Sequence, residues 1–154
     1  MATGSTVRHK VSPIPKGYRS VTPYMAVANA DQLMQFVKRA FDAHEVMAHR
    51  NQDGTIMHAE ARIGDSIVMM GQGGPEMQPR PCTIYLYVPD VDAVYKAALD
   101  AGARSLREPA DQFYGDRNAS VEDPCGNHWF VATHIEDLSP EEFARRAAEM
   151  AKKK

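Results

Sequence analysis

The chain has 154 residues, of which 44% are hydrophobic and 25% charged, and its formal net charge is −2. This composition predicts a folded domain with a sizeable core and argues against an intrinsically disordered chain. Acidic and basic residues are interspersed, so the charge pattern does not favour binding to a nucleic-acid backbone or an anionic membrane surface. We therefore expect small molecules or other proteins as partners.

Two further observations concern the compartment. No apolar run approaches the roughly 18 residues that span a bilayer, and residues 1–17 contain no hydrophobic stretch typical of a secretion signal. Cys82 and Cys125 have no second cysteine at zinc-site or redox-motif spacing. These features predict a cytoplasmic protein with free thiols.

The elements begin after a polar N-terminal segment. Residues 1–17 contain Pro13 and Pro15, which interrupt regular structure and predict a flexible arm. The β-rich run 22–27 predicts a strand. It is followed by apolar residues at helical spacing, which predict an amphipathic helix (Leu33, Phe36, Val37, Ala40 and Phe41). Three runs with strand propensity, separated by Asp/Gly turns, then predict an antiparallel meander (45–51, 55–63 and 66–71).

The series starts again after residues 71–81, which are rich in Gly and Pro and predict a linker. The second series predicts a strand at 83–88, a helix at 89–102, and three more strands (104–108, 116–122 and 127–134). At a constant offset of 61 and without a gap, several positions are identical in the two halves (Thr22/Thr83, Tyr24/Tyr85, Val27/Val88, Asp31/Asp92, Ala40/Ala101 and Gly54/Gly115).

The repeated order of elements predicts an α+β fold of tandem βαβββ modules, about 20–72 and 82–135, in one domain of residues 18–135. A separate C-terminal helix is expected within 136–154. Ser139 is suited to cap it, Pro140 to its first position, and Glu142 to complete a capping box.

Three segments carry a family resemblance: the strand starts YMAV and YLYV, the strand-turn-strand ARIGDSIVMM, and the closing VEDPCGNHWF. Together they resemble the vicinal oxygen chelate superfamily of glyoxalase I, extradiol dioxygenases and bleomycin-resistance proteins, most closely its PhnB-like branch. The resemblance implies a cup-shaped mixed sheet with a ligand inside it, often completed by a second subunit. We expect a homodimer, because each module alone leaves one face of its sheet uncovered.

Metal-dependent members of that superfamily carry a ligand on the first and last strand of each module, usually His, Gln or Glu. The resemblance places these positions at Thr22, Met69, Thr83 and Phe130. Two hydroxyls, a thioether and a phenyl ring are poor donors for a divalent ion. We therefore expect no metal or other cofactor there.

Strand alternation singles out His58 and Glu60 as candidate catalytic residues. One face of residues 55–63 is apolar (Met57, Ala59, Ala61 and Ile63), which leaves His58, Glu60 and Arg62 on the other. An imidazole beside a carboxylate can act as a general base with its orienting partner, or supply two donors to a relocated metal. A polar patch at a subunit seam is the competing interpretation.

The same pair raises a zinc-deaminase alternative. His58-x-Glu60 and the later Pro124-Cys125-x-x-His128 resemble the deaminase pattern, with His in place of the second Cys. That pattern requires both segments at helix starts, whereas these lie in a strand and a hairpin, which argues against it.

The remaining candidates suit a pocket lined by aromatic side chains that end in hydroxyl groups. They are expected to bind a ligand by stacking and a few hydrogen bonds, with Arg117 facing an anionic group at the rim. The predicted ligand-binding residues are Thr22, Tyr24, Met69, Thr83, Tyr85, Tyr87, Arg117 and Phe130. Core packing is the competing interpretation for Met69 and Phe130.

Three functions follow from these patterns. The favoured one is a metal-independent protein that binds a small hydrophobic or aromatic molecule in a cup. The second is a lyase, isomerase or dioxygenase-type enzyme that uses His58 and Glu60. The third is a structural or interaction protein whose own side chains fill the cup.

Overall fold

The computed structural model describes residues 11–154, so part of the predicted arm lies outside the described residues, and residues 11–23 form no helix or strand. Two βαβββ series and a final helix follow, which confirms the predicted order. The first series is β1 (Tyr24–Val27), α1 (Ala30–Phe41), β2 (His44–Arg50), β3 (Ile56–Ile63) and β4 (Ser66–Gln72). The second is β5 (Thr83–Tyr87), α2 (Val91–Asp100), β6 (Arg104–Asp111), β7 (Asp116–Glu122) and β8 (His128–His134), followed by α3 (Pro140–Lys152).

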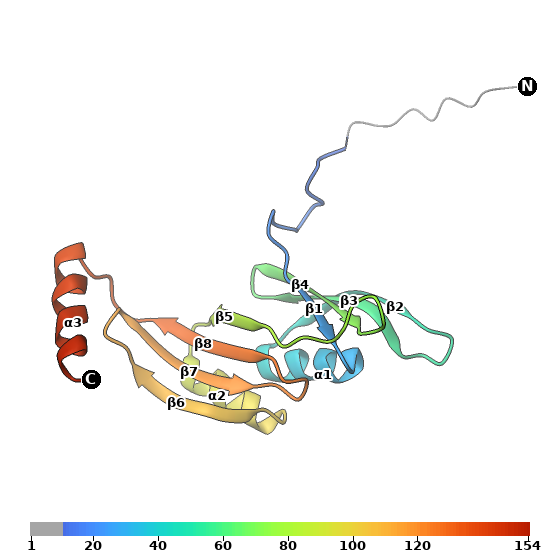
Figure 1. Ribbon diagram of the computed structural model, residues 1–154. Coiled ribbons are helices and arrows are strands. Elements are labelled where there is room, and N and C mark those ends of the chain that lie inside the picture. Colours follow the sequence, from blue (N-terminus) through green and yellow to red (C-terminus); the bar gives the residue numbers. More distant parts are fainter. Residues whose placement is uncertain (1–10) are drawn as a thin grey trace, which may run out of the picture.

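Each module forms its own four-stranded mixed sheet, with strand orders β1-β4-β3-β2 and β5-β8-β7-β6. β1 runs parallel to β4 and β5 parallel to β8, while the other pairs are antiparallel. The helices α1 and α2 lie on the same side of the two sheets and contact each other (Figure 1). The opposite face of each sheet is therefore not covered by a helix within residues 11–154.

One buried core runs through both modules on the helix side. Apolar side chains of α1 and of its sheet belong to the same cluster as residues of α2, β7 and β8. Trp129 of β8 is fully buried, and its ring centre lies 4.7 Å from that of Phe41 in α1. Burial of these large rings stabilises the junction between the two modules.

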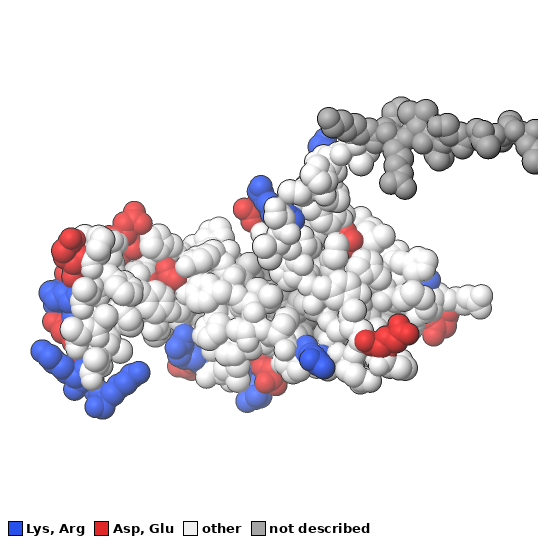
Figure 2. Space-filling model, turned by 45° about the horizontal axis from the view of Figure 1, so that its top comes forward, with Lys and Arg blue, Asp and Glu red and all other residues white. Residues whose placement is uncertain are grey.

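The final helix α3 stands at the far end of the second module (Figure 1). Ser139 Oγ accepts a hydrogen bond from the first turn of α3, as its predicted capping role requires. No side chain of α3 is buried. The helix contacts the module through Phe143, whose ring lies 5.7 Å from Phe113, and through an ion pair between Arg146 and Glu136. Figure 2 shows basic side chains gathered at its C-terminal end.

The helix starts are capped at equivalent positions. Asn29 Oδ1 and Asp90 Oδ1 each accept a bond from a backbone N–H in the first turn, at 3.0 and 3.1 Å. The helix ends are not equivalent, because α1 is longer than α2. Ala40 lies inside α1 whereas Ala101 is the C-cap of α2, so this pair of identical residues does not mark equivalent sites.

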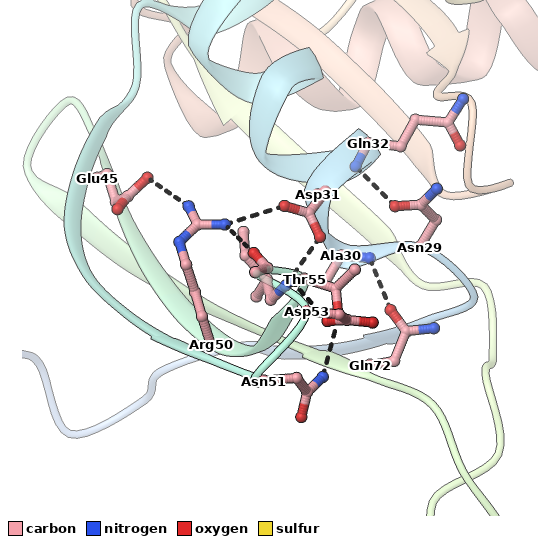
Figure 3. Close-up of polar contacts among 12 residues, drawn as sticks. Asn29, Ala30, Asp31, Gln32, Glu45, Arg50, Asn51, Asp53, Thr55 and Gln72 are labelled. Carbon is pink, nitrogen blue, oxygen red and sulfur yellow. Dashed lines mark hydrogen bonds and ion pairs between the residues drawn. The ribbon is translucent and has the colours of Figure 1, made fainter.

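An aspartate in the first turn ties each helix to the hairpin of its own module, and Figure 3 shows the contacts of Asp31 in the first module. Asp31 Oδ1 accepts from Arg50 Nη1 at 3.1 Å, and its Oδ2 accepts from the Ile56 N–H at 2.8 Å. In the second module, Asp92 accepts from Arg117 Nε and Nη2 at 2.8 and 2.9 Å. The repetition of this aspartate is therefore explained by a structural contact.

The last strand of each module holds the same helix start from a second side. Gln72 Oε1 accepts from the Ala30 N–H at 3.2 Å (Figure 3), and Thr133 Oγ1 accepts from the Val91 N–H at 2.9 Å. These N–H groups lie at the first helical position, where no intrahelical acceptor is available. Two different side chains thus meet the same need in the two modules.

The predicted gap-free offset is wrong in detail. Met69 and Phe130 are 61 residues apart, but their partners across the sheet, Glu60 and Ser120, are 60 apart. The difference arises in β3, where His49 pairs with His58 but the next residue of β2 pairs with Ile56. Met57, which lies between Ile56 and His58, is the extra residue of a β-bulge. A longer turn between β7 and β8 then restores the offset of 61.

The bulge also corrects the predicted apolar face. Ala59, Ala61 and Ile63 are buried, as expected, but Met57 is 47% exposed and Ile56 is buried in its place. Alternation is lost at the bulge because two residues of one strand oppose one residue of the other.

Candidate functional site

The first uncovered sheet face carries a hydrogen-bonded pair at its centre. His58 Nε2 lies 3.3 Å from Glu60 Oε1, and His58 Nδ1 lies 3.4 Å from the Tyr24 hydroxyl. With Nε2 protonated, His58 donates to Glu60 and its Nδ1 accepts from Tyr24, so one neutral tautomer satisfies both contacts. Met69 lies beside them, because it pairs with Tyr24 on one side and Glu60 on the other.

A residue from outside the sheet completes this face. Tyr18 donates its hydroxyl proton to Glu60 Oε2, and this bond raises the pKa of the phenol above its ordinary value. Only 7% of Glu60 is exposed. A cavity of about 360 Å³ lies between the face and the segment that precedes β1, and its lining includes Tyr18, Thr22, Glu60 and Met69.

The second uncovered face is organised around Asp116, of which 3% is exposed. Asp116 Oδ2 accepts from the hydroxyls of Tyr85 and Tyr87 at 2.8 and 2.9 Å, and Oδ1 contacts His134 Nδ1 at 2.9 Å. Burial opposes ionisation of Asp116, but the bonds from His134 and the two tyrosines outweigh it and lower the pKa. The Tyr85 phenol has a raised pKa, chiefly because of its burial.

His134 is held between two carboxylates. Its Nε2 lies 2.8 Å from Asp137 Oδ1, opposite the contact with Asp116. Donation to both carboxylates requires both ring nitrogens to be protonated. Accordingly the contact with Asp137, followed by that with Asp116, raises the pKa of His134.

Asn118 extends the same network and is itself fully buried. Its Nδ2 donates to the hydroxyls of Tyr85 and Tyr114 at 3.1 and 2.6 Å, and its Oδ1 accepts from Arg107 Nη2 at 2.5 Å. Next to it, Phe130 stacks between the rings of Tyr85 and His128, at 5.6 and 4.4 Å. The second face is therefore aromatic, with hydroxyls fixed by a buried carboxylate and a buried amide.

The structure divides the predicted site residues between these two faces. Tyr24, His58, Glu60 and Met69 lie on the first face, whereas Tyr85, Tyr87 and Phe130 lie on the second. Thr22 precedes β1 and its hydroxyl donates to the Arg19 carbonyl at 3.1 Å, and Thr83 is exposed at the start of β5. Arg117 does not join either group, because its guanidinium binds Asp92 and Asp111.

A further cavity of about 520 Å³ lies between the end of α1 and the β5–α2 connection, and Tyr87 is the one predicted site residue that lines it. Two of its basic side chains already have partners. Lys38 Nζ lies 3.2 Å from Glu45 Oε2, and Arg39 Nη2 donates to the Asp100 carbonyl at 2.9 Å. This cavity belongs to the junction between the modules and not to either uncovered face.

The donor set at the four family metal positions does not fit a divalent ion. In the structure Met69 and Phe130 lie opposite Tyr24 and Tyr85, so thioether, phenyl and phenol groups meet there. Within residues 11–154, no cluster of three or more His, Cys, Asp and Glu side chains is placed to hold a metal ion. Within the described residues, His58 and Glu60 therefore lack a third His, Cys, Asp or Glu side chain that could complete a metal site.

The deaminase alternative fails on placement. His58 and Glu60 lie on the first sheet, whereas Cys125 and His128 lie at the turn and strand of the second module. Cys125 Sγ donates to the Asn29 carbonyl, and its burial raises the thiol pKa. This segment carries no zinc-binding arrangement.

The closing DPCGNHW segment instead forms a buried turn around Asp123. Oδ1 accepts from the N–H groups of Cys125 and Asn127 at 2.8 and 3.0 Å. Oδ2 accepts from Asn127 Nδ2 and Trp129 Nε1 at 2.9 and 2.8 Å. The motif thus fixes the start of β8 and orients the buried tryptophan.

Sequence reasoning missed Asp116, Asn118 and Tyr18, whereas strand alternation does place His134 on the same face as Phe130. Alternation along β7 places Asp116 and Asn118 on the face opposite Arg117, so the rule that selected His58 and Glu60 could have found them. Tyr18 gave no comparable signal, because it lies in a segment without periodicity.

No helix in residues 11–154 is long and apolar enough to cross a membrane.

Comparison with known proteins relates the whole domain to one group. The model of the Glyoxalase/Bleomycin resistance protein/Dioxygenase superfamily matches residues 20–131. An uncharacterized protein of Mycobacterium tuberculosis is 34% identical over 151 residues, which span 91% of this chain and 85% of that protein. One from Mycobacterium bovis is 35% identical over 135 residues, covering 80% of this chain and 89% of that protein.

Solved structures show the same fold. TioX from Micromonospora sp. ML1 has a TM-score of 0.66 and 25% identity, and the match covers 75% of this chain and 98% of TioX. TnmS3, an antibiotic binding protein from Streptomyces sp. CB03234, has a TM-score of 0.60 and 17% identity, with 76% and 99% covered. The second likeness concerns the fold alone.

Proposed function

The chain belongs to the Glyoxalase/Bleomycin resistance protein/Dioxygenase superfamily, and from this premise we propose that it binds a small hydrophobic or aromatic molecule without the family metal. The binding surface in this proposal is made by the two uncovered sheet faces. We place the protein in the cytoplasm, in keeping with its two unpaired cysteine thiols.

The observation that carries the proposal is the exposure of fixed aromatic rings. Tyr24, Tyr85 and Tyr87 are 44%, 41% and 60% exposed, yet each hydroxyl lies within hydrogen-bond distance of a neighbouring side chain. Rings held in this way stack on an aromatic ligand at little entropic cost. A structural neighbour with the same fold is an antibiotic binding protein, so this fold can hold a small molecule.

The proposal includes a homodimer, in which a second copy covers the uncovered faces. β1 and β5 are edge strands of their sheets, and the outer edge of β1 is bonded by the linker at one point, where the Arg80 N–H donates to the Ala26 carbonyl at 3.1 Å. Unpaired edges and exposed aromatic faces are surfaces that natural proteins cover. Sedimentation at micromolar concentration tests this part, and a monomer at all concentrations would contradict it.

A thermal-shift screen of aromatic compounds, followed by calorimetric titration of the compounds that stabilise the protein, tests the proposal. Tyr87→Ala should weaken binding by about five- to tenfold, because one stacked ring is worth about 1 to 1.4 kcal/mol. Tyr95→Phe is the matched control, since Tyr95 contacts Ser105 away from both uncovered faces. Equal losses in the two variants, or no stabilising compound at all, would refute the proposal.

The His58–Glu60 contact favours one alternative, an enzyme that uses this pair as a base with its orienting partner. Turnover of any compound found in the screen, lost in His58→Gln but with binding retained, would favour the enzyme. A structural role without a ligand is the remaining alternative, and an exhaustive screen without binding would favour that one.

A further inference from the structure

The carboxylate of Glu60 has an unusual setting, because it is almost fully buried on a face that no helix of the described residues covers. A buried carboxylate requires hydrogen-bond donors. His58 approaches one of its oxygens, and the hydroxyl of Tyr18 occupies the other. Without Tyr18, the second oxygen would lack a donor from the sheet itself.

Tyr18 is held more loosely than the other partners of Glu60. It belongs to neither sheet and follows Gly17, which has a φ of +88°. Residues 11–17 are exposed, and the backbone contact of Tyr18 is a turn bond from its N–H to the Pro15 carbonyl at 3.1 Å. The phenol is therefore the main attachment of this segment to the first face, and a competing hydroxyl would release it at modest cost.

The space around this contact has the size and character of a ligand site. The cavity of about 360 Å³ runs from Glu60 and Met69 to Ile14 and Pro15. Cavities of this volume hold small organic molecules. Next to it, the rings of Tyr24 and His58 stack with their centres 5.6 Å apart.

We infer that the first face binds a neutral aromatic molecule that carries a hydroxyl group, and that Tyr18 occupies the place of this hydroxyl in the free protein. The ligand hydroxyl donates to Glu60 Oε2, and its ring takes the place of the Tyr18 phenol ring in the cavity that Met69 also lines. The inference rests on the proposed binding function and narrows it to phenols and similar compounds. The ligand group that faces Glu60 is neutral, because an anion there would face the Glu60 carboxylate, although Arg19 also lines the cavity.

The test uses 4-methylphenol, which is the tyrosine side chain cut at its β-carbon, and toluene, which lacks the hydroxyl. In Tyr18→Ala, 4-methylphenol should bind at least tenfold more tightly than toluene, measured from the methyl NMR signal of Met69. Adding Glu60→Gln should remove this preference, because a neutral amide is a weaker acceptor than a carboxylate. Equal binding of the two probes, or a preference that survives Glu60→Gln, would overturn the inference.

A second variant covers a folding defect in Tyr18→Ala. Tyr18→Phe keeps the ring but removes its bond to Glu60, so both probes should displace the ring more easily and bind several-fold more tightly than to the native protein, and 4-methylphenol should bind more tightly than toluene because only it donates to Glu60. No gain in this variant would overturn the inference. If the aromatic screen succeeds and these probes fail, the proposed function stands without this ligand class. If the probes bind and no compound of the screen does, the wider proposal is refuted and the phenol site at Glu60 stands on its own.

Discussion

Replacing Asp123 by alanine should destabilise the protein more than any other single removal of a surface or turn carboxylate. Its carboxylate is 3% exposed and accepts four hydrogen bonds within one turn. Alanine removes the acceptor for donors on Asn127 and Trp129, which are both fully buried. Donors left unpaired in a buried site cost far more than the bond itself contributes.

The magnitude follows from the number of stranded donors. Each buried unsatisfied donor costs about 1–3 kcal/mol, and three are affected: the Asn127 N–H, Asn127 Nδ2 and Trp129 Nε1. Water that enters the space of the lost carboxylate recovers part of this. We expect a loss of about 3–5 kcal/mol in the free energy of unfolding, which is a large share of the stability of an ordinary domain.

Urea unfolding at one protein concentration, followed by circular dichroism and by the fluorescence of Trp129, measures this loss. Asp65→Ala is the matched control, because Asp65 is exposed in the β3–β4 turn and accepts one bond, from Ser66 Oγ. It should change stability by less than about 0.5 kcal/mol.

A loss of under 1 kcal/mol for Asp123→Ala would refute this reasoning. Asp123→Asn gives a second check, because the amide keeps the shape of the carboxylate but turns an NH₂ group toward the existing donors. A native-like Asp123→Asn would show that the carboxylate does not organise the turn.

Three further outcomes are expected. Gly54 and Gly115 both have a positive φ, at +87° and +98°, but an added Cβ meets nothing at Gly54 and lies 2.4 Å from a backbone carbonyl oxygen at Gly115. Gly54→Ala should therefore cost about 1 kcal/mol of unfolding free energy and Gly115→Ala clearly more, whereas equal losses would contradict the clash. NMR titration should give His134 a pKa above 6.5, which Asp116→Asn lowers, so its contribution to stability is fully present below pH 6.5 and is lost as the pH rises through the raised pKa. Deleting residues 139–154 should shift the unfolding midpoint little, because α3 buries no side chain, and a large shift would reveal an unseen contact.

The order of elements was predictable because each one carries its own local signal. Asn29 and Asp90 mark the helix starts, and Gly54 and Gly115 mark the hairpins. The exposure of Met57 was not predictable, because a β-bulge depends on how two strands pair and produces no pattern in the sequence of either strand alone. Local patterns therefore gave the modules but not their register.

The candidate site was predictable only where it follows strand alternation. His58 and Glu60 were found in this way and do share a face. Arg117 was expected at the rim of a pocket, but the sequence could not show that Asp92 would bind its guanidinium from another element. Tyr18 reaches Glu60 across 42 residues, and contacts of this kind arise from the fold and not from any local pattern.

The repeat has a consequence for how this protein can diversify. If the two modules were two copies of one shorter chain, their sheet faces would carry the same side chains, and every substitution would appear twice. In this chain the modules keep equivalent helix ties, Asp31 and Asp92, while equivalent sheet positions hold Glu60 in one and Ser120 in the other. Because the two modules lie in one chain, each lining can change by a single substitution, and the two uncovered faces differ in their chemistry.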